Sequence, residues 1–360
     1  VEIASHLAGR RMIGITGSNG KTTTTTLTVL MLEASGRKAV AAGNIGRALT
    51  EAALATVEDV WLVAELSSFQ LKGTIDFRPK IACLLNLYET HLDYHGTMED
   101  YASSKAKLFA NLTGEDTAVY NRDDPFCRGL AQHLRAKSFP FSVKERLERG
   151  VYLHEGRMYI ARDGEEPAEL LAARDVAMKG SHNLENALAA AACALSAGAD
   201  EEAVRRVLRT FRGVEHRLEF VLERNGVQFY NDSKATNPAA TVRSIEAFEG
   251  RPIVLVCGGL DRGSDFMELL PVFRTSVAAV VALGQTREKI LRVAELAGVP
   301  KRAAVDETDP AEAVRQAARL AAEFAEPGQT VLLSPACASW DMFPSFEDRG
   351  RMFKHSVHTL

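Results

Sequence analysis

Residues 14–26 read GITGSNGKTTTTT, a glycine-rich stretch that ends in a lysine and a run of threonines. The common phosphate-binding loop is spelled G-x-x-x-x-G-K-[ST]. Gly20-Lys21-Thr22 matches the end of that spelling, but the nearest upstream glycine is Gly17, so the loop is two residues short. An apolar run at 12–15 precedes the loop, and apolar residues at helical spacing follow it over 23–34. This order of strand, turn and helix predicts a phosphate site.

The residues of this loop suit anion binding for separate reasons. Gly17 and Gly20 let backbone N–H groups converge on an anion without clashes from a Cβ atom. The N-terminus of the following helix adds its dipole. Lys21 offers a mobile positive charge, and the Thr22 hydroxyl is a possible ligand for Mg²⁺. A plain glycine-rich turn is the competing interpretation, but the lysine and threonine directly after the last glycine favour phosphate binding.

Composition limits the class of protein. The chain has 360 residues, which at about 150 residues per domain predicts two domains. The net charge of −4 argues against a nucleic-acid partner, and no apolar run reaches the ~18 residues that span a bilayer. The five scattered cysteines form no C-x-x-C pair. They argue against a disulfide framework or a zinc site and favour reduced thiols in a cytoplasmic protein.

Apolar runs alternate with polar or helical sequence along the first half. They lie at 60–64, 81–85 and 117–120, and this alternation favours a parallel sheet with crossover helices. Short alternating pieces over 151–176 indicate a small hairpin insertion, and 183–197 is an alanine-rich helix.

The second half begins with strands at 218–222 and 227–230. It then repeats strand and helix, with strands at 253–256, 277–282 and 331–333. We therefore predict an α/β fold with two domains. Residues 1–212 form a central, P-loop-type, mostly parallel sheet with flanking helices, and residues 213–360 form a C-terminal Rossmann-like α/β domain.

A second group of candidate residues is acidic and rich in histidine. Glu65 ends a buried strand, and Glu89, His91, Asp93 and His95 follow another. Because the ligand crevice of an open α/β sheet lies outside the carboxyl ends of its strands, we expect these residues to face the same crevice as the loop. Carboxylate and imidazole groups can hold Mg²⁺ or Mn²⁺, although imidazole is unusual for Mg²⁺. Considered without the loop, solvated charges in a polar loop are the simpler interpretation.

Three turns in the second half are rich in hydrogen-bond donors. They read FYNDSKATNPAAT (229–241), CGGLDRGSDF (257–266) and LLSPACASWDMFPSFEDRG (332–350), and each follows a strand. Each alone has an ordinary interpretation as a strand-to-helix turn with a helix cap. Three of them in one domain suggest a single ligand cleft.

Together these motifs resemble the Mur ligase family, whose members add amino acids to the peptidoglycan precursor. The family's phosphate loop is similarly short, and the resemblance runs in order along nearly the whole chain. Within the family, ELSSFQL, NDSKATN and SPACASWDMF resemble the members that add D-glutamate, and the DNPR-type signature of members that add diaminopimelate or lysine does not occur. The other matching motifs are GNIG (43–46), HLDYHG (91–96), GSHNLENALAA (180–190) and EHRLE (215–219).

The resemblance implies roles in ATP binding for residues in both halves. Asn183 and Asn186 contact adenine, Asp232 bonds the ribose, and Arg217 neutralises the transferring phosphate. The phosphates are held by loop residues Gly17, Ser18, Asn19, Gly20, Lys21, Thr22 and Thr23.

It also implies two metal sites, for Mg²⁺ with Mn²⁺ as an alternative. Thr22 and Glu65 ligate one ion, and His91 ligates the second. Lys105 matches the lysine that the family carbamylates, which turns a cation into an anion able to bridge metals. Lys107 is the nearby competitor, but the spacing from Tyr101 favours Lys105. We predict Lys21, His91, Lys105, Arg217 and Lys234 as the catalytic residues.

The remaining implied roles concern the other substrates. Asn44 contacts the muramoyl part, and Ser67 joins it in substrate binding. Lys234 reaches phosphate from the second domain. Arg262 stands near a position where the family often has lysine, and the two side chains are not interchangeable at a carboxylate site. The residues that match the family's D-glutamate positions are Thr236, Ser339 and Phe346.

The function implied is an ATP-dependent, peptide-bond-forming ligase of cytoplasmic peptidoglycan precursor synthesis. ATP converts the terminal carboxylate of UDP-N-acetylmuramoyl-L-alanine into an acyl phosphate, which the D-glutamate amine attacks. We expect a monomer whose domains close over the substrates, with neither nucleic-acid nor membrane partners.

Family members begin with a further N-terminal domain that binds the UDP moiety. The loop here lies close to Val1, so we expect that domain to be missing from the sequence given. Two alternatives stay open at this point. A related Mur-type or folylpolyglutamate-synthetase-like ligase shares the loop, the metal residues and the lysine, and a P-loop regulatory protein shares the loop alone.

Overall fold

The computed structural model describes residues 1–8, 11–55, 59–88, 92–178, 180–248 and 250–360. The chain divides into two compact units, Val1–Arg212 and Gly213–Leu360. We call them the N-terminal unit and the C-terminal unit, and describe each by itself.

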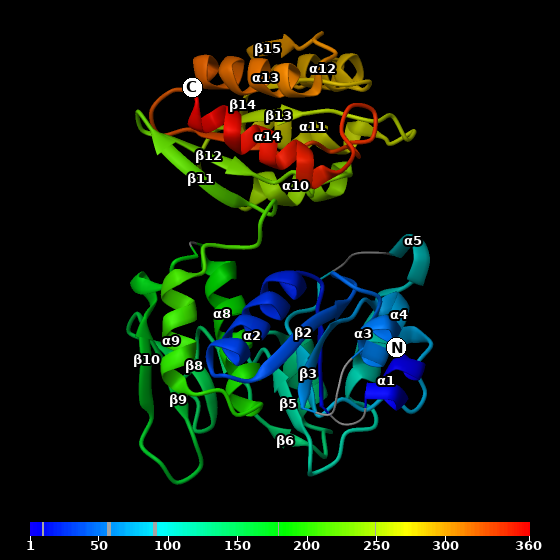
Figure 1. The fold of residues 1–360 in the computed structure, drawn as a ribbon, viewed down its shortest axis with the longest axis vertical. Helices are drawn as coiled ribbons and strands as arrows, with labels where there is room; N and C mark the ends of the chain where they lie inside the picture. Colours follow the sequence, from blue (N-terminus) through cyan, green and yellow to red (C-terminus); the bar gives the residue numbers. More distant parts are fainter. Residues whose placement is uncertain (9–10, 56–58, 89–91, 179, 249) are drawn as a thin grey trace. The chain divides into compact units, whose positions relative to one another are not determined.

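The N-terminal unit is built on a six-stranded sheet with the order β2-β3-β1-β4-β5-β6, and its pairings are parallel (Figure 1). The inner strands β1, β3 and β4 are covered on both faces, which explains why their sequences are continuously apolar rather than alternating. The strands are β1 (Met12–Thr16), β2 (Lys38–Gly43), β3 (Val60–Glu65), β4 (Ile81–Leu84), β5 (Thr117–Tyr120) and β6 (Lys137–Ser138).

Helices cover both faces of this sheet. Ile13 and Ile15 of β1 join the core on one face, and Met12 joins the core on the other, as the alternation of side chains in a strand requires. The first face carries α2 (Lys21–Ala34) and α8 (Ser181–Ser196), with α9 (Glu201–Thr210) packed against α2. The second face carries α1 (Glu2–Ala8), α3 (Leu49–Ala55), α4 (Ser68–Lys72), η1 (Lys107–Phe109) and α7 (Pro125–Ala131).

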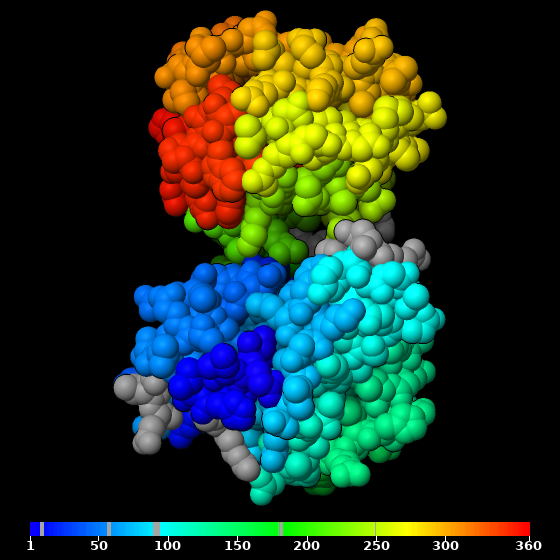
Figure 2. Space-filling view, turned by 90° about the vertical axis from the view of Figure 1, so that its right-hand side faces the viewer, coloured from blue at the N-terminus to red at the C-terminus, as the bar shows by residue number. Residues whose placement is uncertain are grey.

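Two further helices, α5 (Leu92–His95) and α6 (Met98–Ala106), follow β4. Helix α1 lies at the surface of the N-terminal unit, where it packs against α3 (Figure 2, dark blue).

The predicted hairpin over 151–176 is part of a larger element. It belongs to a four-stranded sheet with the order β10-β9-β8-β7, in which β8, β9 and β10 are antiparallel neighbours and β7 joins β8 in parallel. The sequence prediction was therefore too small, because β7 has only two residues and shows no alternation of its own. The strands are β7 (Phe141–Ser142), β8 (Gly150–His154), β9 (Arg157–Ala161) and β10 (Ala168–Ala172), followed by η2 (Ala173–Asp175).

The C-terminal unit has a second six-stranded sheet, with the order β11-β12-β16-β13-β14-β15. Strand β11 is antiparallel to β12 at one edge, and the remaining pairings are parallel. The predicted α/β fold class is thus confirmed. The strands are β11 (Glu219–Arg224), β12 (Val227–Asn231), β13 (Ile253–Cys257), β14 (Val277–Ala282), β15 (Lys301–Ala304) and β16 (Thr330–Leu333).

Helices again cover both faces of the second sheet. Helices α13 (Pro310–Phe324) and α14 (Phe346–His358) pack on one face (Figure 1, orange and red). The other face carries α10 (Pro238–Glu246), η3 (Phe266–Leu269), α11 (Leu270–Ser276) and α12 (Arg287–Leu296). Among the helices described, none combines the length and apolar character needed to cross a bilayer.

Candidate active site

The glycine-rich loop joins the carboxyl end of β1 to α2, and the end of β4 braces it. Ser18 N donates to Asn86 O (3.1 Å), and Asn19 N donates to Asn86 Oδ1 (2.9 Å). The Ser18 hydroxyl also bonds to the hydroxyl of Tyr101 (2.9 Å). Gly20 is the N-cap of α2 and supplies no side-chain cap, so the amides of the first turn can serve an anion. Sequence reasoning missed Asn86, whose only signal was its place just after a strand.

The last glycine of the loop, Gly20, cannot easily be replaced by another residue. Gly20 has φ 82°, and a Cβ atom there would lie 2.1 Å from Asn186 Oδ1. The structure therefore places Asn186, on α8, directly against the loop. Asn183 lies one turn earlier, and Asn186 Nδ2 donates to Asn183 Oδ1 (3.4 Å). Asn186, predicted to contact adenine, thus lies beside the loop predicted to hold the phosphates, and Asn183, predicted for the same role, is hydrogen-bonded to Asn186.

Two lysine side-chain nitrogens converge on one carbonyl oxygen of the loop. Lys21 Nζ donates to Gly17 O (2.7 Å) and to Ser18 O (2.9 Å). Lys105 Nζ donates to the same Gly17 O (2.9 Å) and to Thr16 Oγ1 (3.3 Å). Two positive charges on these nitrogens would repel each other, which favours a neutral amine on one of them or an anion at the loop.

Lys105 is buried, with 1 % of its surface exposed. Burial, together with the nearby charge of Lys21, lowers the pKa of Lys105 to about 6. The ion pairs found among the described residues include no partner for it. Lys107 instead donates to Thr74 O (3.1 Å), away from the loop. The structure therefore separates the two candidate lysines and places Lys105 at the loop.

Glu65 lies beside the loop, because its strand partner is Ile15 of β1. Its Oε1 accepts from Asn44 Nδ2 (3.0 Å), whereas its Oε2 is buried and accepts no hydrogen bond from any residue described. A buried carboxylate oxygen without a donor is costly unless a cation meets it. With the Thr22 hydroxyl on the first turn of α2, these oxygen ligands fit Mg²⁺.

The other predicted site residues of the N-terminal unit lie in different surroundings. Ser67 is the N-cap of α4: its hydroxyl accepts from Gln70 N (3.3 Å), and its backbone N–H donates to Gln70 Oε1 (2.9 Å). That hydroxyl is therefore engaged in a capping box. Thr23 is buried on the first turn of α2. His91, predicted as a metal ligand, lies outside the described residues.

Three neighbouring strands of the C-terminal unit end at one edge of the sheet. Strands β12, β16 and β13 are adjacent and parallel, so the turns that follow them share an edge. These turns carry Lys234 and Thr236, Ser339, and Arg262, respectively. Such an edge is the usual ligand site of an open α/β sheet.

Arg217 lies in a strained segment before β11. The flanking residues His216 (φ 64°) and Leu218 (φ 42°) are both left-handed without being glycine. Strain of this kind persists where surrounding contacts impose it and is common at functional sites. Leu218 N donates to Asp232 Oδ1 (3.2 Å), and Lys234 N donates to His216 O (3.1 Å). The turn after β12 therefore fixes the Arg217 segment.

Asp232, predicted to bond a ribose, is almost completely buried. Its Oδ2 accepts from Ser244 Oγ (2.5 Å) and from Ser334 Oγ (2.9 Å). Burial raises the pKa of Asp232 to about 6, against these hydrogen bonds, which lower it. In this structure its carboxylate ties together the turns after β12 and β16.

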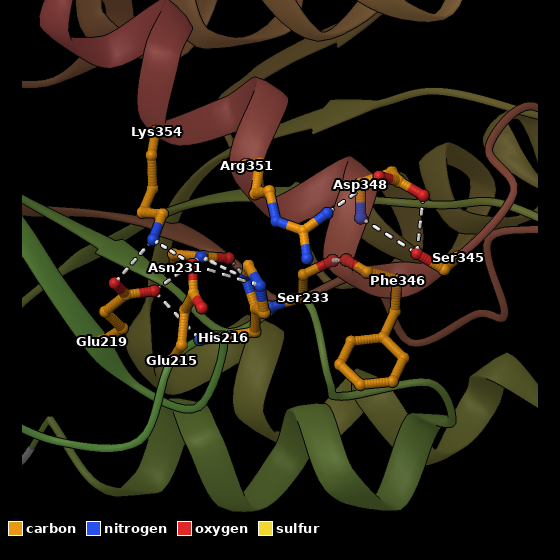
Figure 3. Close-up of polar contacts among 10 residues, drawn as sticks. All are labelled: Glu215, His216, Glu219, Asn231, Ser233, Ser345, Phe346, Asp348, Arg351 and Lys354. Atoms are coloured by element: carbon orange, nitrogen blue, oxygen red, sulfur yellow. Dashed lines mark hydrogen bonds and ion pairs between the residues drawn. The ribbon is translucent and has the colours of Figure 1, made fainter.

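A polar network holds Glu215, His216 and Glu219, which lie on either side of Arg217 in the sequence (Figure 3). Asn231 Nδ2 donates to His216 Nδ1 (2.9 Å) and to Glu219 Oε2 (2.9 Å). Burial lowers the pKa of His216, in keeping with a neutral ring whose Nδ1 accepts. Lys354 of α14 bonds to Glu219 (2.8 Å) and Glu215 (2.7 Å). The segment is therefore held to both β12 and α14.

Arg349 holds two of the turns together, and sequence reasoning missed it. Its guanidinium, 1 % exposed, donates to Ser233 Oγ (3.0 Å), Ser233 O (2.9 Å) and Cys337 O (3.2 Å). Burial lowers its pKa to about 10. Ser233 Oγ in turn donates to Phe346 O (2.7 Å). The backbone of Phe346, predicted to receive D-glutamate, thus lies beside the turn that carries Lys234 and Thr236.

Family comparisons agree over both units. Residues 15–194 match the Mur ligase middle domain, and residues 216–337 match the Mur ligase, glutamate ligase domain. The whole chain is 49 % identical to a UDP-N-acetylmuramoylalanine–D-glutamate ligase of Geobacillus kaustophilus and 46 % identical to that of Bacillus subtilis, and it spans 77 % of the length of each.

Solved structures share the fold at low identity. Acinetobacter baumannii MurF matches with a TM-score of 0.67 and 19 % identity, over 98 % of this chain and 78 % of that one. E. coli FolC in complex with DHPP and ADP matches with a TM-score of 0.63 and 18 % identity, over 99 % and 91 %. By its sequence matches over both units, the chain belongs to the Mur ligase family.

Proposed function

We propose that this chain is the ATP-dependent ligase that adds D-glutamate to UDP-N-acetylmuramoyl-L-alanine in peptidoglycan precursor synthesis. The observation that carries the proposal is 49 % identity over all 360 residues to a ligase of that name. The geometry supports it, because the N-terminal unit offers an anion site with the Lys21 ammonium and the buried Lys105 amine, and the C-terminal unit gathers donor-rich turns at one sheet edge.

The roles of the two units follow. In the N-terminal unit, the loop amides and Lys21 bind the β- and γ-phosphates of ATP, with Asn183 and Asn186 toward the adenine. In the C-terminal unit, Arg217 and Lys234 neutralise charge on the transferring phosphoryl group. Thr236, Ser339 and the Phe346 backbone receive the amino acid.

Mg²⁺, when bound, neutralises charge on the phosphate oxygens. Glu65 and Thr22 would hold one ion, and the predicted ligands also include His91, for a second ion, and Lys105. Asn44 fixes the Glu65 carboxylate through the hydrogen bond to Oε1, which leaves Oε2 for the ion. We also propose that Lys105 is carbamylated, since its amine is buried beside Lys21 and the carbamate would bring a negative charge there.

The chemistry follows from the need to activate a carboxylate. An oxygen of the alanyl carboxylate attacks the γ-phosphorus of ATP, and ADP leaves. The D-glutamate amine then attacks the carbonyl carbon of the acyl phosphate, and inorganic phosphate leaves as the amide bond forms. The protein contributes mainly position and charge.

The proposal includes a cytoplasmic monomer. The five cysteines are free and buried, in keeping with a reducing compartment.

A phosphate-release assay on the full-length protein tests the proposal. With ATP, Mg²⁺ and UDP-N-acetylmuramoyl-L-alanine, we expect release to depend on D-glutamate and not on L-glutamate or diaminopimelate. Release with L-glutamate and a folate-type acceptor would instead favour a folylpolyglutamate-synthetase-like enzyme. ATP binding without phosphate release under any of these conditions would favour a regulatory protein.

A further inference from the structure

Arg262 and Trp340 form an exposed cation–aromatic pair in the C-terminal unit. Arg262 Cζ lies 4.7 Å from the centroid of the Trp340 ring, within the range of an attractive contact between a guanidinium and an aromatic face. Trp340 is 63 % exposed, although the preceding Ser339 is 2 % exposed. The chain therefore turns from a buried serine to an indole in solvent within one residue.

The charge of Arg262 is not neutralised by the acid next to it. The Asp261 carboxylate accepts from Lys289 Nζ (2.5 Å) and from Gly263 N (3.0 Å). The ion pairs found in the described part of the chain include that Asp261–Lys289 pair but none with Arg262. The guanidinium is thus held over an indole, with its charge open to an incoming anion.

Two backbone contacts hold the loops that carry this pair together. Leu260 N donates to Ala338 O (2.9 Å), and Gly258 N donates to Pro335 O (2.8 Å). The two loop backbones lie so close together that a Cβ atom at Gly259 would lie 2.4 Å from Ala338 O. Because β13 and β16 are parallel neighbours, both loops lie at the ligand edge of the sheet. The backbone contacts between the two loops therefore fix the segments that carry Arg262 and Trp340 at this edge.

We propose that Trp340 is a positioning residue that sets the selectivity for an acidic amino acid. Its ring restricts the long side chain of Arg262, so that the guanidinium is held ready for the distal carboxylate of the amino acid. The inference rests on the proposed function, since it assumes that an acidic amino acid binds beside Ser339. A guanidinium that is held in place loses less conformational freedom on binding than a free one.

Steady-state kinetics of the full-length protein test this role. We expect Trp340→Ala to raise KM for D-glutamate about three- to tenfold, with kcat and KM for ATP unchanged. Trp340→Phe keeps an aromatic face and is expected to restore most of the affinity. Because the indole is exposed, the melting temperature is expected to stay that of the wild type.

A double-mutant cycle separates this role from a general surface effect. In an Arg262→Gln background, Trp340→Ala is expected to add no further rise in KM, because the ring then has no cation to hold. Met267→Ala removes another exposed apolar side chain of the same unit, 45 % exposed, and is expected to leave every constant unchanged.

Each outcome bears on the inference. The positioning role is overturned if Trp340→Ala leaves KM for D-glutamate unchanged. It is also overturned if Trp340→Ala raises KM equally in the wild-type and Arg262→Gln backgrounds. In both cases, D-glutamate-dependent activity of the wild type leaves the proposed function intact. A wild-type protein that releases no phosphate in response to D-glutamate overturns the proposed function and the inference with it.

Discussion

Lys21→Ala is expected to lower kcat/KM for D-glutamate-dependent ligation by about a thousandfold, the scale for losing one charged donor at a transferring group. The Lys21 ammonium lies over the loop, on Gly17 O and Ser18 O, where a phosphate would bind. Because it is attached to the first residue of α2 and is only partly buried, its removal is expected to leave the melting temperature nearly unchanged. Steady-state kinetics and thermal melting measure the two effects.

Two further variants test whether the loss of activity in Lys21→Ala is specific to the Lys21 ammonium. Lys38→Ala removes an exposed lysine at the start of β2 and is expected to keep wild-type kinetics. Lys21→Arg keeps the charge but changes its shape, and is expected to restore little, since a planar guanidinium does not replace a compact ammonium. If folded Lys21→Ala turned over at the wild-type rate, Lys21 and its loop would have no role in the reaction.

Lys105→Ala is expected to lose ligation by a comparable factor and to regain part of it when small carboxylic acids are added. A buried ammonium without a carboxylate is unfavourable, and the pKa of Lys105 is lowered to about 6 by burial and by Lys21. The neutral amine reacts with CO₂ to give a carbamate and a proton. The alanine variant leaves space in which acetate or propionate supplies the missing negative charge.

The matched control for this rescue is Lys21→Ala, which lacks a cation and is not expected to respond to added acid. A carbonyl carbon signal from ¹³C-labelled CO₂, present in the wild type and absent from Lys105→Ala, tests the carbamate itself. Full activity of Lys105→Ala, or a rescue equally strong in both variants, would rule out the proposed role.

The sequence predicted elements that are apolar throughout or strongly periodic. Strands β1, β3, β5 and β14 were predicted almost residue for residue, because buried parallel strands are continuous apolar runs. Strand β2 (Lys38–Gly43) was not predicted, since it begins with an exposed lysine and is only half-buried. Edge strand β15 (Lys301–Ala304) begins with two exposed basic residues and gave no signal either.

Contacts between distant residues limited the prediction of the site. The family motifs identified the loop, Glu65 and Lys105, because each lies within a local pattern. Nothing local indicated that Arg349 would reach Ser233, which lies 116 residues away. The pairing of Arg262 with Trp340 likewise depends on two loops that only the sheet order brings together.

In the proposed reaction, the γ-phosphate of ATP activates a carboxylate. If UDP-N-acetylmuramoyl-L-alanine carries oxygen-18 at both oxygens of its alanyl carboxylate, attack on the γ-phosphorus places a labelled oxygen between carbon and phosphorus. Attack by the D-glutamate amine then breaks the carbon–oxygen bond. We therefore predict that mass spectrometry finds one labelled oxygen in each inorganic phosphate released by the full-length protein. Ligation that releases only unlabelled phosphate would contradict an acyl phosphate intermediate.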